Sequence, residues 1–410
     1  MLRILTLIVV LVVFASGCAV QELVLAEETE LVVAASSVDE ALLLDVGVVE
    51  FDPRIPEDNR PEKTGIYEDI RRAEAKYIPY HLKTTLQGAG HWGAVRVIPS
   101  ESAFTDVIVS GAINRSDGEY IELEITVMDA AGRHWFTRSY ETQTGLTSYS
   151  KRRDRRRDPY QKVFNDFAND LQQHVAMLPP KQLQQTRQVS ELKFFGDMSP
   201  VAYDGYLTQD KEGIASVVRL PAENDPSVGR MRQIRERDRL VVDTLNEHYA
   251  NFYYGIAIPY RNWRKNARAE TVKFRQEKRS AQMQALVGVI VLAGSTQINT
   301  SSSSRNTRNI NRALQYQGIT RGLNTVFAAL QRNRDAGLHL EAITELSESF
   351  GNEAAPMVVN VEGQERRLTG TAEAQYESWR RLLREIYEAE TGFSQSVEVG
   401  APARAPEPTG

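Results

Sequence analysis

Few side chains of this chain are of a type and spacing that could carry chemistry. Cys18 is the only cysteine, which excludes an intrachain disulfide and a thiolate zinc site. The six histidines are scattered without a His-x-x-x-His pair, and no Gly-x-Ser-x-Gly motif occurs. Glu122 and Glu124 stand two residues apart on an expected strand, where an exposed sheet face explains them better than catalysis does. We therefore expect no catalytic residues, no metal site and no cofactor.

Cys18 ends a short apolar segment that begins the chain. Arg3 precedes an apolar stretch from Ile4 to Phe14, and Ala15-Ser16-Gly17 places small residues directly before the cysteine. A basic start, an apolar run of about 7 to 15 residues and small residues at a cleavage site are typical of a secretory signal, which is too short to span a bilayer. We predict a signal peptide over 1–17 that is cleaved between Gly17 and Cys18.

The segment Ala15-Ser16-Gly17-Cys18 resembles the lipobox of bacterial lipoproteins, which usually has leucine where this chain has Ala15. The resemblance implies that Cys18 becomes the first mature residue and carries fatty acyl chains such as palmitate. Each buried CH2 contributes about 0.8 kcal/mol, so a multiply acylated terminus stays in the membrane. Ala19, where enterobacterial lipoproteins retained at the inner membrane have aspartate, implies the periplasmic face of the outer membrane. The alternative is a secreted protein with an incidental cysteine.

The composition is that of a folded protein with no general affinity for nucleic acid. Of the 410 residues, 41% are hydrophobic. The chain has 49 Lys and Arg and 54 Asp and Glu, which gives a net charge of -5. One basic run is the exception, with six cations in seven residues: Lys151, Arg152, Arg153, Arg155, Arg156 and Arg157. It is a candidate patch for an anionic partner such as lipid phosphate, and a solvated loop is the alternative.

Hydrophobic patterning predicts a tether over 18–39 and an α/β domain over 40–178. The expected elements are a buried strand at Leu42–Phe51, a helix at Ile66–Leu86 interrupted by Pro79, strands at Val95–Ile98, Val107–Ile113, Tyr120–Met128 and His134–Thr142, and a helix after Asp158-Pro159. Ile121, Leu123, Ile125 and Val127 alternate with polar residues, which indicates a strand with one buried face. This order predicts an α/β sandwich in which helices pack on a mixed sheet.

Three segments of this region carry a second resemblance. Asp45–Phe51, Asp106–Ile113 and the strand ending at Met128–Arg133 resemble the periplasmic α/β domain of the curli-secretion-channel lipoprotein and of the TolB N-terminal type. The resemblance covers about a third of the chain and brings no catalytic motif. It implies a scaffold or assembly module and a homo-oligomer.

The rest of the chain is predicted to be mainly helical. A polar connector is expected over 179–225, a long helical hairpin over 226–350, a β-hairpin and C-terminal helix over 351–393, and a disordered tail over 394–410. The predicted fold class is therefore α+β, with a mixed-sheet α/β sandwich, a long helical hairpin, and a C-terminal β-hairpin plus helix.

Three further motifs have two interpretations each. Gly88–Gly93 matches a dinucleotide-binding pattern, but it follows a helix and precedes a strand, which favours a helix cap. The aromatic residues between Tyr249 and Trp263 share a helix face that suits either core packing or stacking on glycan rings. Ala285–Gly294 is wholly apolar, but its helical rise of about 15 Å is half a bilayer core. It suits helix contact in a core or oligomer, or else shallow membrane contact.

These observations predict a lipid-anchored outer-membrane protein that acts in the periplasm as an assembly or interaction scaffold, for example as a component of an oligomeric envelope or secretion complex. The expected partners are the membrane, through acyl chains on Cys18, envelope proteins or peptidoglycan, and further copies of the chain. Two alternatives stay open: a peptidoglycan-associated regulator of cell-wall enzymes and an envelope glycan hydrolase.

Overall fold

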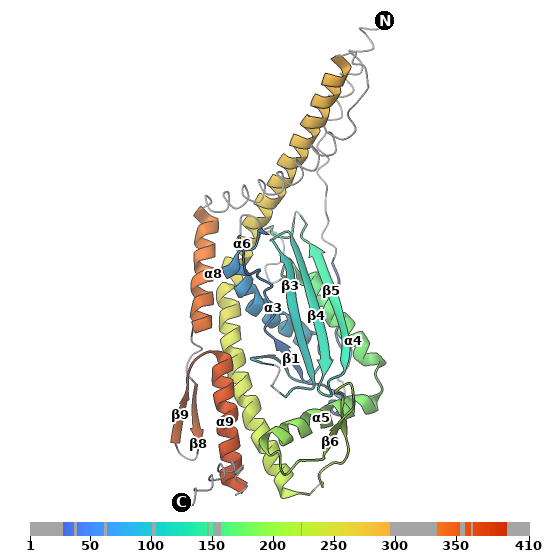
Figure 1. Ribbon diagram of the computed structural model, residues 1–410, viewed down its shortest axis with the longest axis vertical. Coiled ribbons are helices and arrows are strands. Elements are labelled where there is room, and N and C mark those ends of the chain that lie inside the picture. Colours follow the sequence, from blue (N-terminus) through green and yellow to red (C-terminus); the bar gives the residue numbers. More distant parts are fainter. Residues whose placement is uncertain are drawn as a thin grey trace, which may run out of the picture.

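A five-stranded mixed sheet lies at the centre of the protein. The computed structural model describes residues 28–36, 39–60, 64–100, 104–145, 147–150, 157–222, 224–295, 334–352, 357–361 and 364–391. Over these residues the chain combines the sheet with helices and two small two-stranded sheets, which confirms the predicted α+β class (Figure 1).

The sheet has the strand order β2-β1-β3-β4-β5. Strand β1 (Val46–Val49) pairs in parallel with β2 (Val95–Ile98) and with β3 (Val107–Ser116). Strands β4 (Tyr120–Asp129) and β5 (His134–Gln143) continue the sheet in antiparallel pairing. Strand β1 is shorter than the predicted strand at Leu42–Phe51, whose first residue belongs to the 3-10 helix η1 (Glu40–Leu42).

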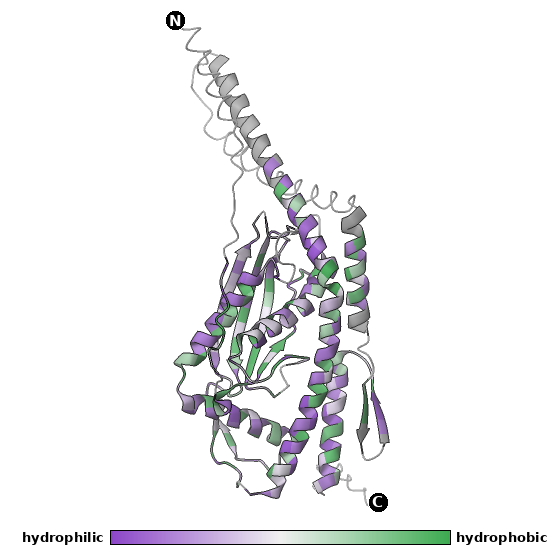
Figure 2. Ribbon diagram, turned by 180° about the vertical axis from the view of Figure 1, so that it is seen from behind, coloured by the Kyte–Doolittle hydropathy of each residue, from purple (hydrophilic) through white to green (hydrophobic). Residues whose placement is uncertain are grey.

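Helices α3 (Glu68–Ala89) and α4 (Gln161–Met177) cover one face of this sheet. The apolar residues of β4 between Ile121 and Val127 are at most 1% exposed, whereas Glu122 and Glu124 between them are only half-buried. Phe167 of α4 packs against the rings of Phe136 and Tyr140 on β5. Figure 2, seen from the helix-covered side, shows hydrophobic residues gathered along the strands. The alternation read from the sequence therefore marks the buried face correctly.

Helix α3 continues through Pro79, so the predicted interruption is wrong. Proline cannot donate to the carbonyl four residues earlier, which leaves that acceptor without its helical partner. Here the Ala75 carbonyl accepts a hydrogen bond from the Phe51 N–H at 3.0 Å, which replaces the missing bond. The helix then ends before Gly90, whose φ of 71° is a left-handed helix cap, as the prediction for Gly88–Gly93 requires.

The predicted connector over 179–225 is instead largely regular structure. It contains helix α5 (Pro180–Met198) and a hairpin of β6 (Leu207–Gln209) and β7 (Ala215–Val217). Phe194 and Phe195 are fully buried although they are adjacent on the helix, because Arg380 of α9 lies over the Phe194 ring and Tyr203, beyond the end of α5, contacts the Phe195 ring. A helix that is covered by two neighbours lacks the single apolar stripe by which it could be recognised.

The longest element is α6 (Pro226–Ser295), whose 70 residues correspond to about 105 Å. Helix α8 (Arg334–Asn352) packs along it, so the described parts of 226–350 confirm the predicted pair of helices. Residues 296–333, which include the predicted connecting loop, lie outside the described part. None of the helices in the described part of the chain is long and apolar enough to cross a membrane.

The C-terminal part confirms its prediction, with β8 (Met357–Val361) paired to β9 (Gln364–Leu368) and followed by α9 (Ala372–Thr391). The predicted tail over 394–410 lies outside the described residues. One continuous hydrophobic core runs from Leu44 in the α/β part to Tyr387 on α9. The segments predicted as separate domains therefore share a single core.

Candidate functional site

The sequence-predicted sites fall mostly outside the described residues. Cys18, Gly17 and the basic residues 151–156 are all outside them, so the lipidation site and the anionic-partner patch stay predictions. Arg157 alone is described, and its guanidinium lies 3.0 Å from the Glu28 carboxylate. Among the described residues, no group of three or more His, Cys, Asp or Glu is arranged to hold a metal ion.

Part of the predicted tether is docked on the body of the protein. The Val32 N–H donates to the Asn169 side chain of α4 at 2.8 Å, and the Asn169 amide donates to the Glu30 carbonyl at 2.9 Å. The Ala34 N–H donates to the Ala89 carbonyl at the end of α3. Residues 28–34 are thus a strap along α4 whose first described residue, Glu28, is held by Arg157.

A buried ion pair joins the long helix α6 to the start of α4. The Arg264 guanidinium donates to both Asp158 oxygens, at 2.9 and 2.7 Å, and the Asp158 carboxylate also accepts from the Tyr160 N–H. The guanidinium lies 4.2 Å from the ring centroid of Tyr260. Burial alone would raise the pKa of Asp158, but the Arg264 charge outweighs burial and holds that pKa well below its usual range.

A second buried carboxylate continues this network on α3. Glu74 accepts hydrogen bonds from the hydroxyls of Tyr260, at 2.6 Å, and Ser116, and its other oxygen lies 3.3 Å from the Arg71 guanidinium. Burial raises the pKa of Glu74, and Arg71 opposes that effect. Because Glu74 and Asp158 are both nearly inaccessible to solvent, this network joins α3, β3, α4 and α6 and offers no access to a substrate.

His81 of α3 lies in the same interface. Its Nδ1 is 2.7 Å from the Tyr253 hydroxyl on α6, and its Nε2 is 2.9 Å from the Gln161 side chain on α4. Burial lowers the pKa of His81 below its ordinary value, and Asp158 only partly opposes this. The aromatic residues of α6 beside it are packing residues, since Tyr253 stacks on Tyr77 at 4.6 Å and Tyr260 and Trp263 are buried. The glycan-stacking interpretation of that stripe is wrong.

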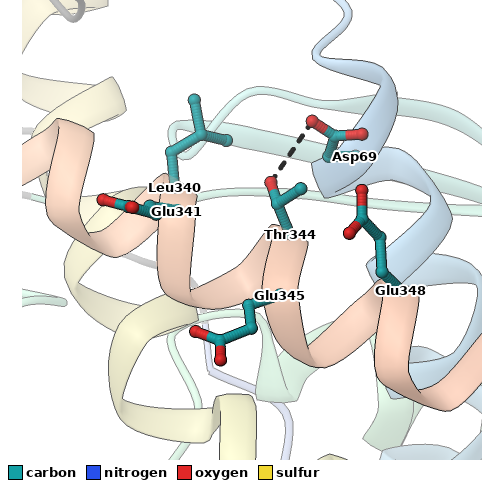
Figure 3. A pocket seen from close by; sticks show the side chains of 6 residues that line it. All are labelled: Asp69, Leu340, Glu341, Thr344, Glu345 and Glu348. Atoms are coloured by element: carbon teal, nitrogen blue, oxygen red, sulfur yellow. Dashed lines mark hydrogen bonds between the residues drawn. The ribbon is translucent and has the colours of Figure 1, made fainter.

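Several cavities open at the surface of the described part, and two of them have linings of opposite charge. One of them, of 460 Å³, lies between α3 and α8 and is lined by Asp69, Leu340, Glu341, Thr344, Glu345 and Glu348 (Figure 3). We name it the acidic groove; in it the Thr344 hydroxyl donates to Asp69 at 3.2 Å. A cavity of 270 Å³, the basic groove, lies between β9 and α9 and is lined by Arg366, Arg367, Leu368, Ser378, Arg381, Leu382 and Glu385.

A further cavity, of 320 Å³, separates α5 from α6 and has four arginines in its wall: Arg187, Arg232, Arg235 and Arg239. Arg235 is half-buried, and its guanidinium donates to the Ser190 hydroxyl at 2.7 Å. Arg239 pairs with Asp45, whose N–H donates to Asp106 at the start of β3. Guanidinium groups in such a wall can bind carboxylate or phosphate groups. The sequence could have revealed this arginine cluster, because the arginines of α6 are spaced by three and four residues, which places them on one helix face.

No family model matches the chain, and neither a curated protein nor a solved structure matches it significantly. The resemblances to the lipobox and to the curli and TolB domains therefore stay predictions that rest on the residues quoted for them.

Replacing Arg264 by methionine, which keeps much of its volume, should lower the free energy of unfolding by about 3 to 5 kcal/mol, because it leaves the Asp158 carboxylate buried without its cation. Asp158→Asn in the same chain should recover part of that loss, since asparagine carries no charge and still accepts from the Tyr160 N–H. Urea unfolding of the four members of this double-mutant cycle measures the effect. Strictly additive losses would contradict the assigned coupling.

The free energy of unfolding should fall as the pH drops below about 6.5, the ordinary pKa of histidine, and His81 should account for part of this fall. Its folded-state pKa is lowered, so the unfolded state binds more protons there and the contribution of His81 is complete only above about pH 6.5. His81→Gln should reduce the drop in melting temperature between about pH 7.5 and pH 5.5. Glu74, whose pKa is raised, acts in the opposite direction, so the difference from the unsubstituted chain is the quantity to compare. His134→Gln, on the exposed side of β5, is the control, and equal slopes in all three proteins would exclude the role of His81.

Proposed function

We propose that this protein is an envelope lipoprotein, held by acyl chains on Cys18 at the periplasmic face of the outer membrane, and that it acts there as an assembly or interaction scaffold. The observation that carries the proposal is the position of the single cysteine, directly after an apolar segment and two small residues. The docked strap over 28–34 supports it, because a tether between membrane and body needs a firm attachment on the body.

A scaffold role is supported by the type of surface that the protein presents. The buried ionic groups hold the helices in one body. Of the two solvent-facing grooves, one is lined mainly by acidic residues and the other mainly by basic residues. The acidic groove has three glutamates and an aspartate, whereas the basic groove has three arginines and one glutamate. Two such surfaces on different elements are complementary between neighbouring copies, as a ring of identical subunits requires. We therefore extend the proposal to a homo-oligomer in which the acidic groove of one copy meets the basic groove of the next.

Cys18→Ser should abolish metabolic labelling with palmitate and lower the affinity of the mature chain for the membrane. The reason is that an acylated terminus adds roughly 0.8 kcal/mol of membrane affinity per buried CH2, which serine cannot supply. Ala19→Ser is the control and should stay labelled. A chain that is labelled equally with and without Cys18, or that fractionates with the cytosol, would exclude the lipoprotein proposal.

Charge reversal in either groove should shift the assembly toward monomers. We expect Glu345→Lys and Arg367→Glu each to raise the dissociation constant by about tenfold, and the double reversal to recover much of the affinity, because like charges face each other only in the single variants. Size-exclusion chromatography with light scattering at several concentrations measures this. A chain that is monomeric at every concentration would refute the oligomer.

A further inference from the structure

Helix α6 extends well past the body of the protein. The turn at Gly118 lies against Arg264 and Ala267, and the Arg268 guanidinium donates to the Thr144 hydroxyl at 3.0 Å. Thr144 directly follows β5, so this hydrogen bond joins α6 to the end of the sheet. The helix nevertheless continues to Ser295, about 40 Å beyond Arg268, and Figure 1 shows it projecting past the strands.

The projecting part has a basic stem and an apolar tip. The stem, residues 265–279, carries six lysines and arginines against two glutamates. The tip, residues 285–294, is built only of alanine, glycine, valine, leucine and isoleucine. A helical segment without polar side chains has no side that favours water. Its rise of about 15 Å matches one leaflet of a bilayer core of about 30 Å.

The strap brings the start of the described chain to the place where α6 leaves the body. Glu28 pairs with Arg157, and the next residue, Asp158, pairs with Arg264. Cys18 precedes Glu28 by ten residues, so an extended chain lets it reach at most about 36 Å from Glu28. The tip lies about 26 to 39 Å beyond Arg268 along the helix. The proposed acyl anchor and the tip thus extend from the same end of the body, and both can lie at a similar distance from it.

We propose that the tip of α6 inserts into the membrane leaflet that holds the acyl chains on Cys18, with the basic stem at the lipid phosphates. The inference rests on the proposed lipid anchor for the identity of that leaflet. A lipid surface fits better than a second copy of the helix, because two basic stems side by side repel each other, whereas anionic headgroups attract them. The last cation, Arg279, stands about 9 Å before the tip, which is enough to cross a headgroup layer of about 5 to 8 Å.

The test uses the mature chain with Cys18→Ser, so that membrane binding without the acyl anchor is measured and a failure of lipidation does not affect the result. This chain contains no other cysteine, so Ile290→Cys can be labelled with an environment-sensitive fluorophore. Vesicles of phosphatidylethanolamine and phosphatidylglycerol should increase and blue-shift the emission of the label. The same label at Ile258→Cys, an exposed position of α6 within the body, is the control and should not respond.

Flotation with the same vesicles gives the affinity. Val287→Asp combined with Val291→Asp should weaken vesicle binding at least tenfold, while Ile258→Asp should leave it unchanged, and 0.5 M salt should weaken binding of the parent chain. Far-ultraviolet circular dichroism verifies that each variant folds. Absence of vesicle binding by the parent chain overturns the inference. It is likewise overturned if the tip aspartates dissociate an oligomer but leave vesicle binding unchanged, which would assign the tip to self-association.

Discussion

The pairing of Arg264 with Asp158 is the interaction on which the arrangement of this protein depends. Both groups are buried, and neither charge can be left alone there without a large cost in free energy. Arg264 belongs to the helix that leaves the body, and Asp158 belongs to the start of the helix that covers the sheet. Because the two must stay together, α6 is held across the α/β part, and the helices packed on α6 are positioned with it.

A second buried cation repeats this design nearer the N-terminal end of α6. Arg380 of α9 contacts Asp197 of α5 and lies 3.5 Å from Asp238 of α6. Burial raises the pKa of Asp238, and the Arg380 charge opposes that effect. Charged groups at two places thus join elements that local patterning assigns to different domains. The result is one body with a single core, from which the grooves and the projecting part of α6 remain available to partners.

The sequence predicted best those elements whose signal is local. The alternation in β4, the hairpin before α9 and helix α9 itself each lie within about 20 consecutive residues, and the structure confirms them. Prediction from the sequence failed where a residue far away in the chain determines the local structure. Helix α3 passes Pro79 only because Phe51 donates to Ala75, and α5 is hidden because two neighbours share its apolar residues. The acid–base partners of the buried network were also missed, since Asp158 was recognised only as a helix start.

The sequence by itself determined the features that need no partner: a cysteine after an apolar segment, a basic stem before an apolar tip, and strands with one apolar face. Tertiary structure alone decided which charges meet. Arg264 and Asp158 stand 106 positions apart, and nothing in the local pattern of either residue specifies the other. Only folding brings them within hydrogen-bonding distance, because the energy of a buried charge depends on its neighbours in space and not on its neighbours along the chain.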